Sequence, residues 1–231
     1  MKKRHFPLIA IGLAMFVFGA GALTAEKVMS SRIASRVYEQ LPNATDVQVS
    51  IPLSNIPSDM ASDSIKSAQI EIGQSSDDST KVSPSLEIDA RNIAKSKPNL
   101  IGTLEVTATI PAATILKQAD FADAEIVGNT LQVSVGSGGL GRASLIPKYS
   151  NNQLYFELKS VSVFGSEIPA STLPADVQDQ IKSRSVRDLD IPKGMKVKSV
   201  SISSKGLSLK LYGSNIQIGN FGSIFKDKNK G

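Results

Sequence analysis

The sequence predicts an α+β protein built mainly from antiparallel sheet, with about nine or ten strands and one or two short internal helices. Apolar and polar residues alternate through most of the chain after residue 45, as they do in half-buried strands. The connections between these segments are rich in Gly, Ser, Asn and Asp and are too short for the helical crossovers that parallel strands need. Only 5% of the residues are aromatic and none is Trp, so the core is aliphatic and much of it is β-branched.

The N-terminus has the pattern of an export signal. Basic residues at positions 2–4 precede an uncharged, apolar run over residues 6–25. As a helix this run would be about 30 Å long, enough to cross a bilayer. The small residues 20–22 fit a signal-peptidase site, so residues 1–25 are either a signal-anchor or a cleaved signal peptide. In both cases we expect the rest of the chain outside the cytoplasmic membrane, on a single-pass anchor or secreted to the cell envelope.

Residues 26–41 are predicted to form a long helix that continues the membrane segment and stops at Pro42. Its apolar residues recur every four positions, at Met29, Ile33, Val37 and Leu41. This stripe fits an amphipathic helix lying on the membrane or a helix packed on the core of the domain. The second interpretation is favoured, because only the position beside the apolar run points to the membrane.

The alternating pattern predicts strands along the rest of the chain. The predicted strands cover residues 47–51, 68–72, 86–90, 104–110, 131–135, 154–158, 161–163, 197–202, 207–211 and 216–218. Two other stretches predict helices: residues 112–119 behind Pro111, and residues 173–182 with Pro174 at the helix start.

The chain is expected to form one domain. Its 231 residues can bury a substantial apolar core, and the absence of cysteine means that packing alone must hold the fold. The polar loop over residues 73–85 does not separate two domains. Residues 26–222 are therefore predicted to be a single domain, and residues 223–231 a polar tail.

The charge balance argues against a nucleic-acid partner. Of the 26 Lys and Arg residues, three lie at positions 2–4, and the remaining 23 face 21 Asp and Glu. A body this close to neutral offers no strong basic stripe to follow a phosphate backbone.

Catalytic residues are hard to find in the exported part of the chain. The single histidine, His5, belongs to the export signal, so a zinc site and a Ser-His-Asp triad lack a candidate residue. Carboxylate pairs such as Asp188 with Asp190 lie in polar, turn-like runs that do not raise a carboxyl pKa for acid catalysis. We therefore expect no catalytic residue, no metal site and no cofactor.

The segment GSGGLG over residues 136–141 matches the spacing of a dinucleotide-binding loop. That loop requires a helix directly after it, whereas the residues that follow alternate and contain Pro147. The glycines are therefore interpreted as a hairpin turn.

A long sheet with one apolar face and few helices must curl around a helix or upon itself. An aliphatic interior of this kind can hold acyl chains, since burial gives about 0.8 kcal/mol per methylene. The same interior can also be filled by its own side chains. Alternation leaves both alternatives open: a non-enzymatic lipid-binding protein, or a structural envelope protein with a filled aliphatic core and no ligand. An enzyme that uses a carboxylate pair is a distant third.

The C-terminal half carries a recognisable order of motifs. It contains a strand with Leu154, Phe156 and Leu158, the segments FGSEIP and IPKGMKV on either side of a short helix, and the pairs Gly206-Leu207 and Tyr212-Gly213. This order resembles the LmeA-like phospholipid-binding family of actinobacterial envelope proteins. The resemblance implies a tubular lipid-binding-like fold, in which a curved sheet wraps on a long N-terminal helix. It also implies phospholipid as the partner, activity at the outside of the cytoplasmic membrane, and support of envelope lipid or lipoglycan assembly.

The same resemblance gives the strand-to-helix unit a role. Gly165 and Pro169 end a strand, so that the following helix can close one side of an apolar groove. The residues expected to line this groove are Phe156, Leu158, Val161 and Val163 on the strands and Leu173, Val177 and Ile181 on the helix.

Overall fold

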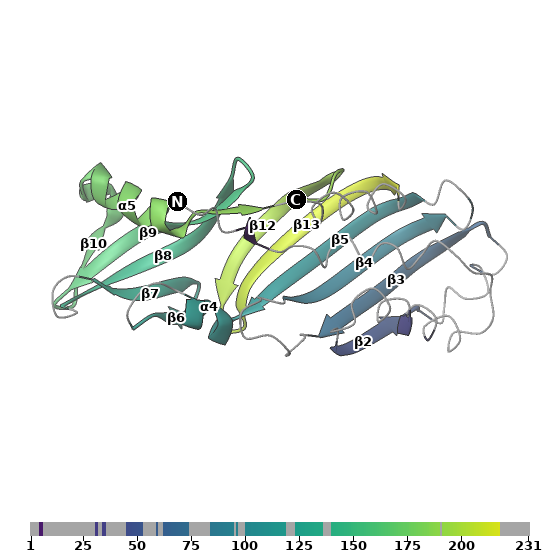
Figure 1. Ribbon diagram of the computed structural model, residues 1–231, viewed down its shortest axis with the longest axis horizontal. Coiled ribbons are helices and arrows are strands. Elements are labelled where there is room, and N and C mark those ends of the chain that lie inside the picture. Colours follow the sequence, from purple (N-terminus) through teal and green to yellow (C-terminus); the bar gives the residue numbers. More distant parts are fainter. Residues whose placement is uncertain are drawn as a thin grey trace, which may run out of the picture. The chain divides into compact units, whose positions relative to one another are not determined.

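The computed structural model describes most of the chain between residues 45 and 217 (Figure 1). The described residues are 5–6, 31, 34–35, 45–52, 59, 62–73, 84–94, 96, 100–118, 123–135, 140–189 and 191–217. The strands are β1 (His5–Phe6), β2 (Thr45–Ser50), β3 (Ser64–Gly73), β4 (Ser85–Ala94), β5 (Leu100–Pro111), β6 (Glu125–Val127), β7 (Thr130–Val135), β8 (Gly141–Ser150), β9 (Gln153–Val163), β10 (Ser166–Pro169), β11 (Arg187–Leu189), β12 (Met195–Ser203) and β13 (Gly206–Gln217). The helices are α4 (Ala112–Gln118), the 3-10 helix η4 (Ala170–Thr172) and α5 (Ala175–Ser185).

The strands form two sheets. The first has the order β1-β11-β9-β8-β7-β6, with β10 also paired to β9, and the second has the order β12-β13-β5-β4-β3-β2 (Figure 1). Strand β1 runs parallel to β11, whereas the ladders β2 to β4, β6 to β9 and those of β10 and β11 with β9 are antiparallel. The antiparallel pairing predicted from the short connections is therefore confirmed for these ladders.

The prediction of an α+β fold, with one curved sheet of nine or ten strands wrapped on a long N-terminal helix, is wrong, because the described part of the chain is mostly β. The strands are divided between two sheets, and the residues that the structure describes include no long N-terminal helix. Of the helix expected over residues 26–41, only Ser31, Ala34 and Ser35 are described, each as helical. The error has a physical cause: alternation identifies the buried face of a strand, but the edge partner is chosen by backbone hydrogen bonds, which every strand offers equally.

The described ranges contain no helix that is long and apolar enough to cross a bilayer. The export or anchor segment expected over residues 6–25 lies outside the described residues, except for Phe6 in β1. The predicted polar tail over residues 223–231 also lies outside them.

The chain divides into two compact units. The first comprises Met1–Phe6, Thr109–Asp190 and Ser199–Leu209, and the second comprises Pro7–Ala108, Ile191–Lys198 and Lys210–Gly231. The first unit holds the sheet of β6 to β11, and the second holds β2, β3, β4 and most of β5.

The second unit has an aliphatic core that follows the predicted alternation. Its buried side chains come from three neighbouring strands: Ala68, Ile70 and Ile72 of β3, Leu86, Ile88 and Ala90 of β4, and Leu104, Val106 and Ala108 of β5. The alternation then slips by one residue in all three strands, because the next buried residues are Ile65, Ile93 and Ile101. Asn92 has a φ of 53° at this slip, and a Cβ on Gly102 would lie 2.9 Å from the Asn92 Cβ. The left-handed Asn92 in β4 and Gly102 in β5 therefore allow the pattern of buried residues to shift by one position here.

In the first unit, helix α5 fills a gap along one edge of β9. Strand β10 pairs with residues 160–163 of β9, and β11 pairs with residues 153–154. Between these pairings, the buried Ser185 hydroxyl of α5 accepts a hydrogen bond from the Phe156 backbone N–H at 2.9 Å. The Lys182 ammonium lies 4.6 Å from the centroid of the Tyr155 ring, a cation–π contact. These contacts fix the helix beside the strand (Figure 1).

Replacing Ser185 should therefore loosen α5. In Ser185→Ala the Phe156 N–H loses its acceptor, and we expect the free energy of unfolding to fall by about 1 to 3 kcal/mol. Ser183→Ala is the matched control, since its exposed hydroxyl donates to the Gln180 carbonyl of the same helix, and it should change stability by less than about 0.5 kcal/mol. Urea unfolding of both variants measures the difference, and equal losses would contradict this role of Ser185.

Candidate lipid-binding site

A β-bulge in β9 decides which of its side chains share a face. The β8–β9 ladder pairs Ser144 with Ser160 but Leu145 with Leu158, so Lys159 is an extra residue in β9. Without the bulge, residues 158 and 161 would point to opposite faces, because successive side chains alternate. With it, their partners in β8 are residues 145 and 143, which lie on the same face.

The bulge therefore brings the four predicted strand residues together. Phe156, Leu158, Val161 and Val163 pair in turn with residues 147, 145, 143 and 141 of β8. Strand β7 extends the same face, because Leu131, Val133 and Val135 pair with residues 145, 143 and 141. We call this set the β7–β9 apolar face: Leu131, Val133, Val135, Ala143, Leu145, Pro147, Phe156, Leu158, Val161 and Val163.

Burial changes along the β7–β9 apolar face. Leu131, Leu145 and Leu158 are buried, with no more than 4% of any of them exposed. Val161 and Val163 are only half-buried, and so is Val135 at the same end of the ladder. The face is therefore closed in its middle and partly open at Val135 and Val163.

The predicted helix residues lie beside β9 but are less buried. Leu173 and Ile181 are half-buried, whereas Val177 is 38% exposed. Helix α5 meets β9 through Lys182 and Ser185, and positions three to four residues apart share a helix face. Val177 lies to the side of that face. Its place in a wall shared with the strand residues stays a prediction.

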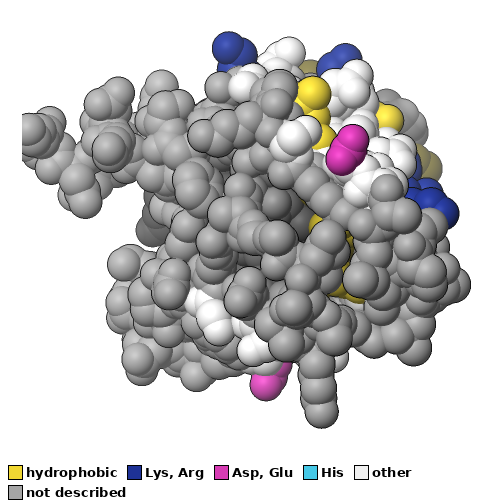
Figure 2. Space-filling model, turned by 90° about the vertical axis from the view of Figure 1, so that its right-hand side faces the viewer, with side chains coloured by type: hydrophobic (Ala, Val, Ile, Leu, Met, Phe, Trp, Pro, Cys, Tyr) yellow, Lys and Arg dark blue, Asp and Glu magenta, His cyan; other side chains and the backbone are white. Residues whose placement is uncertain are grey.

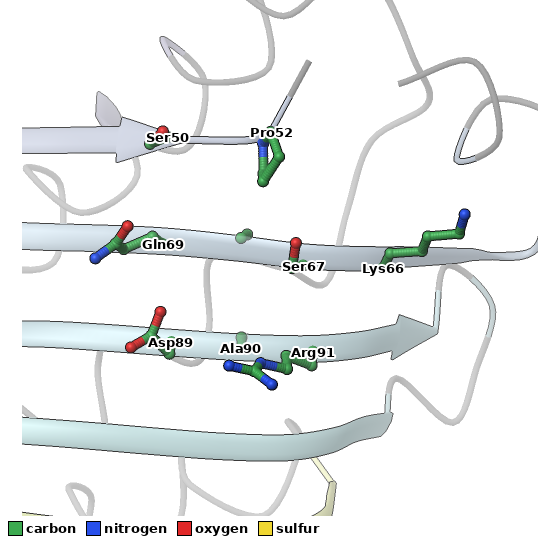
Figure 3. Close-up of a pocket in the computed structure, with 9 residues that line it drawn as sticks. Ser50, Pro52, Lys66, Ser67, Gln69, Asp89, Ala90 and Arg91 are labelled. Atoms are coloured by element: carbon green, nitrogen blue, oxygen red, sulfur yellow. The ribbon is translucent and has the colours of Figure 1, made fainter. Parts of the chain in front are cut away.

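The second unit has a polar depression that the sequence pattern did not predict. It has a volume of about 390 Å³ and lies over β3 and β4 beside the end of β2 (Figure 3). Its lining residues are Ser50, Pro52, Lys66, Ser67, Ala68, Gln69, Asp89, Ala90 and Arg91. Two cations and one carboxylate suit a hydrated polar group better than an acyl chain. The one signal in the sequence is that polar residues fill the alternate positions opposite the buried ones in β3 and β4.

Charged side chains of the described residues are largely balanced. Exposed ion pairs join Arg142 to Glu125, Lys148 to Glu157 at 3.6 Å, and Lys198 to Glu105 at 3.0 Å. On the face shown in Figure 2, the described Lys and Arg side chains lie apart from one another. Exposed pairs of this kind contribute at most about 1 kcal/mol each, so their main effect is to neutralise the surface.

Of the carboxylate pair Asp188 and Asp190, the structure describes only the first residue. Asp188 of β11 accepts a hydrogen bond from the Gln153 amide of β9 at 2.9 Å, and Asp190 lies outside the described residues. Asp188 thus helps to join two strands. Within the described part of the chain, no three or more His, Cys, Asp or Glu side chains are grouped as metal ligands would be.

Comparison with known proteins assigns the family. No curated protein and no solved structure matches the chain. A family model described as LmeA-like phospholipid-binding matches residues 20–211, which is most of the 231 residues. The match covers most of both units and the whole β7–β9 apolar face, and it confirms the resemblance seen in the C-terminal motifs. The chain therefore belongs to the LmeA-like phospholipid-binding family.

Proposed function

We propose that this protein is a non-enzymatic phospholipid-binding protein of the cell envelope that holds acyl chains against the β7–β9 apolar face. The observation that carries the proposal is the face itself, because the bulge at Lys159 aligns ten apolar residues from three strands. Each methylene moved from water onto such a surface gains about 0.8 kcal/mol without directional bonds. Membership of the family supports phospholipid as the ligand.

Export and membrane association complete the proposal. They rest on the basic residues 2–4 and the apolar run over residues 6–25, which resemble an export signal. We infer that the protein works at the outer side of the cytoplasmic membrane and supports envelope lipid or lipoglycan assembly.

A structural protein with a filled core is the competing function. It is favoured by the deep burial of Leu131, Leu145 and Leu158, whose side chains already have neighbours on every side. The half-buried Phe156, Val161 and Val163 favour lipid instead, since a filled core would bury them too. The two functions differ in whether the purified protein carries lipid.

Native mass spectrometry of the full chain tests for that lipid. We expect phospholipid to copurify and to exchange with added labelled phospholipid, because an apolar face that is partly open gains from being covered. A protein that is isolated without lipid and takes up no labelled phospholipid would contradict the proposed function and favour the filled core.

Added bulk tests where the lipid lies. In a lipid-sized groove, Val163→Trp and Val177→Phe should displace ligand, lowering the bound lipid while changing the stability of the lipid-free protein by less than about 1 kcal/mol. In a filled core Val163→Trp would overpack the protein and cost about 1 to 3 kcal/mol, whereas the variant at Val177, which is 38% exposed, tests only for displaced lipid. Bound lipid is counted by mass spectrometry and stability is measured by urea unfolding.

Val127→Phe is the control for these variants. Val127 is a 46% exposed valine of β6 in the same sheet, and it does not belong to the β7–β9 apolar face. Its enlargement should leave both lipid and stability unchanged. If Val163→Trp destabilises the protein and both variants keep its lipid, Val163 belongs to the core and Val177 lies outside any lipid site.

A further inference from the structure

Two large apolar side chains stand in solvent at one end of the first sheet. Phe164 is 82% exposed and Leu140 is 61% exposed. Leu140 directly precedes Gly141 and Phe164 directly follows Val163, and Gly141 and Val163 form a pair of the β8–β9 ladder. Both side chains therefore leave the same end of one ladder. We call Leu140 and Phe164 the β8–β9 tip.

The fold gives no reason for a phenylalanine at this turn. Phe164 has a φ of 51°, a left-handed conformation that is costly for a bulky residue and that Asn or Gly adopts more readily. Gly165 follows with a φ of 82°, as expected in a tight turn. With 82% of its surface in water, Phe164 contributes little packing to offset the strain. A partner that covers the Phe164 ring from outside would account for a phenylalanine at this position.

The surroundings of the tip are uncharged. Residues 126–141 and residues 160–166 contain no Asp, Glu, Lys or Arg. The first charged side chains beyond them are Glu125 and Arg142, which pair with each other, Glu167, which accepts a hydrogen bond from the Ser160 hydroxyl at 2.7 Å, and Lys159, which is exposed at the bulge. A surface that moves into hydrocarbon loses least free energy of hydration when it carries no charge.

The tip also adjoins one end of the β7–β9 apolar face. Val135 and Val163 flank it and are half-buried, and Leu145 and Leu158 further along the ladder are buried. The half-buried end of the β7–β9 apolar face thus lies directly beside the exposed tip. An acyl chain taken up at the tip would have a short path to this face.

We propose that the β8–β9 tip inserts into the surface of a phospholipid bilayer and is the entry through which acyl chains reach the β7–β9 apolar face. A bilayer fits better than a protein partner, because two side chains on hairpin ends fall far short of the roughly 1,000 Å² that a stable protein interface buries. Such side chains can still be accommodated at the boundary between headgroups and acyl chains. The inference rests on the proposed function, since a protein that carries phospholipid must exchange it with a membrane.

A single tryptophan tests the insertion directly. The chain contains no Trp, so the full-length variant Phe164→Trp has one indole fluorophore, located at the tip. With phosphatidylcholine vesicles we expect its emission to shift to the blue and to be quenched by phosphatidylcholine brominated on the acyl chains. The effect should persist in high salt, because no charge is involved. An apolar N-terminus that inserts elsewhere does not affect this local signal.

Val127→Trp is the matched control. Val127 pairs with Thr130 at the other end of β7 from Val135, and it is also an exposed apolar residue. The indole of Val127→Trp should remain open to aqueous iodide, and acyl-chain bromine should quench the indole of Phe164→Trp several-fold more strongly. Adding Leu140→Ser to Phe164→Trp should weaken that quenching several-fold, because half of the apolar tip is gone. Equal quenching at positions 127 and 164, or binding that requires anionic lipid and is lost in salt, would overturn the proposal.

A second variant separates this inference from the proposed function. Phe164→Asn suits the left-handed turn and should fold at least as well as the unchanged protein, which thermal unfolding verifies. It should still take up monomeric short-chain phosphatidylcholine, but it should extract labelled phospholipid from vesicles several-fold more slowly. If Phe164→Asn takes up monomeric lipid and also extracts vesicle lipid at the unchanged rate, the proposed role of the β8–β9 tip is contradicted, but lipid binding is not. If the unaltered protein takes up no monomeric lipid, the proposed function itself fails.

Discussion

The antiparallel ladder between β8 and β9 is the feature on which the first unit depends. It pairs every residue of Gly141–Ser150 with β9, and it joins β7 on one side to β10, β11 and α5 on the other. A single register shift between Ser144 and Leu145 decides which side chains of β9 lie on the same face as those of β8. With a regular ladder, half of β9 would turn its valines toward the opposite face, and the apolar surface would be cut in two. One inserted residue thus determines whether the apolar surface of the three strands is continuous.

The opposite edge of β9 shows how the chain completes a sheet without a full-length partner. Two short strands cover its ends, and α5 covers the middle through the Ser185 hydroxyl, so the Phe156 N–H is satisfied. An unpaired edge of this kind would otherwise invite another strand. The arrangement also gives the strand-to-helix unit a definite mechanical role, because Pro169 ends β10 and Pro174 precedes the first turn of α5. The helix is held by polar contacts at one end, while Val177 is left partly in solvent.

Much of the fold could be read from local pattern. The predicted strands over residues 68–72, 86–90 and 104–110 lie within β3, β4 and β5, and the predicted helix over residues 112–119 coincides with α4 apart from its last residue. The glycine segment is bracketed by β7 and β8, which pair antiparallel, as a hairpin requires. The alternating pattern mispredicts strand boundaries where a bulge shifts it by one residue. Residues 154–158 and 161–163 look like two strands but form the single strand β9, with the bulge between them. The short strands β6, β10 and β11 were not predicted, because three or four residues carry too little periodicity.

The sequence by itself determined that the core is aliphatic, that the sheets are mainly antiparallel and that the family motifs of the C-terminal half are present, since composition, alternation and turn residues act locally. It also singled out Phe156, Leu158, Val161 and Val163. Tertiary structure decided what these residues share, because a face is defined by the partner strand: residues 141, 143, 145 and 147 of β8 bring them to one side. It likewise decided that there are two sheets, and that Leu140 and Phe164, far apart in the sequence, leave the end of one ladder together. Every strand edge offers similar backbone hydrogen bonds, so local sequence does not specify which distant segments pair. The pairing depends on the packing of all the strands together.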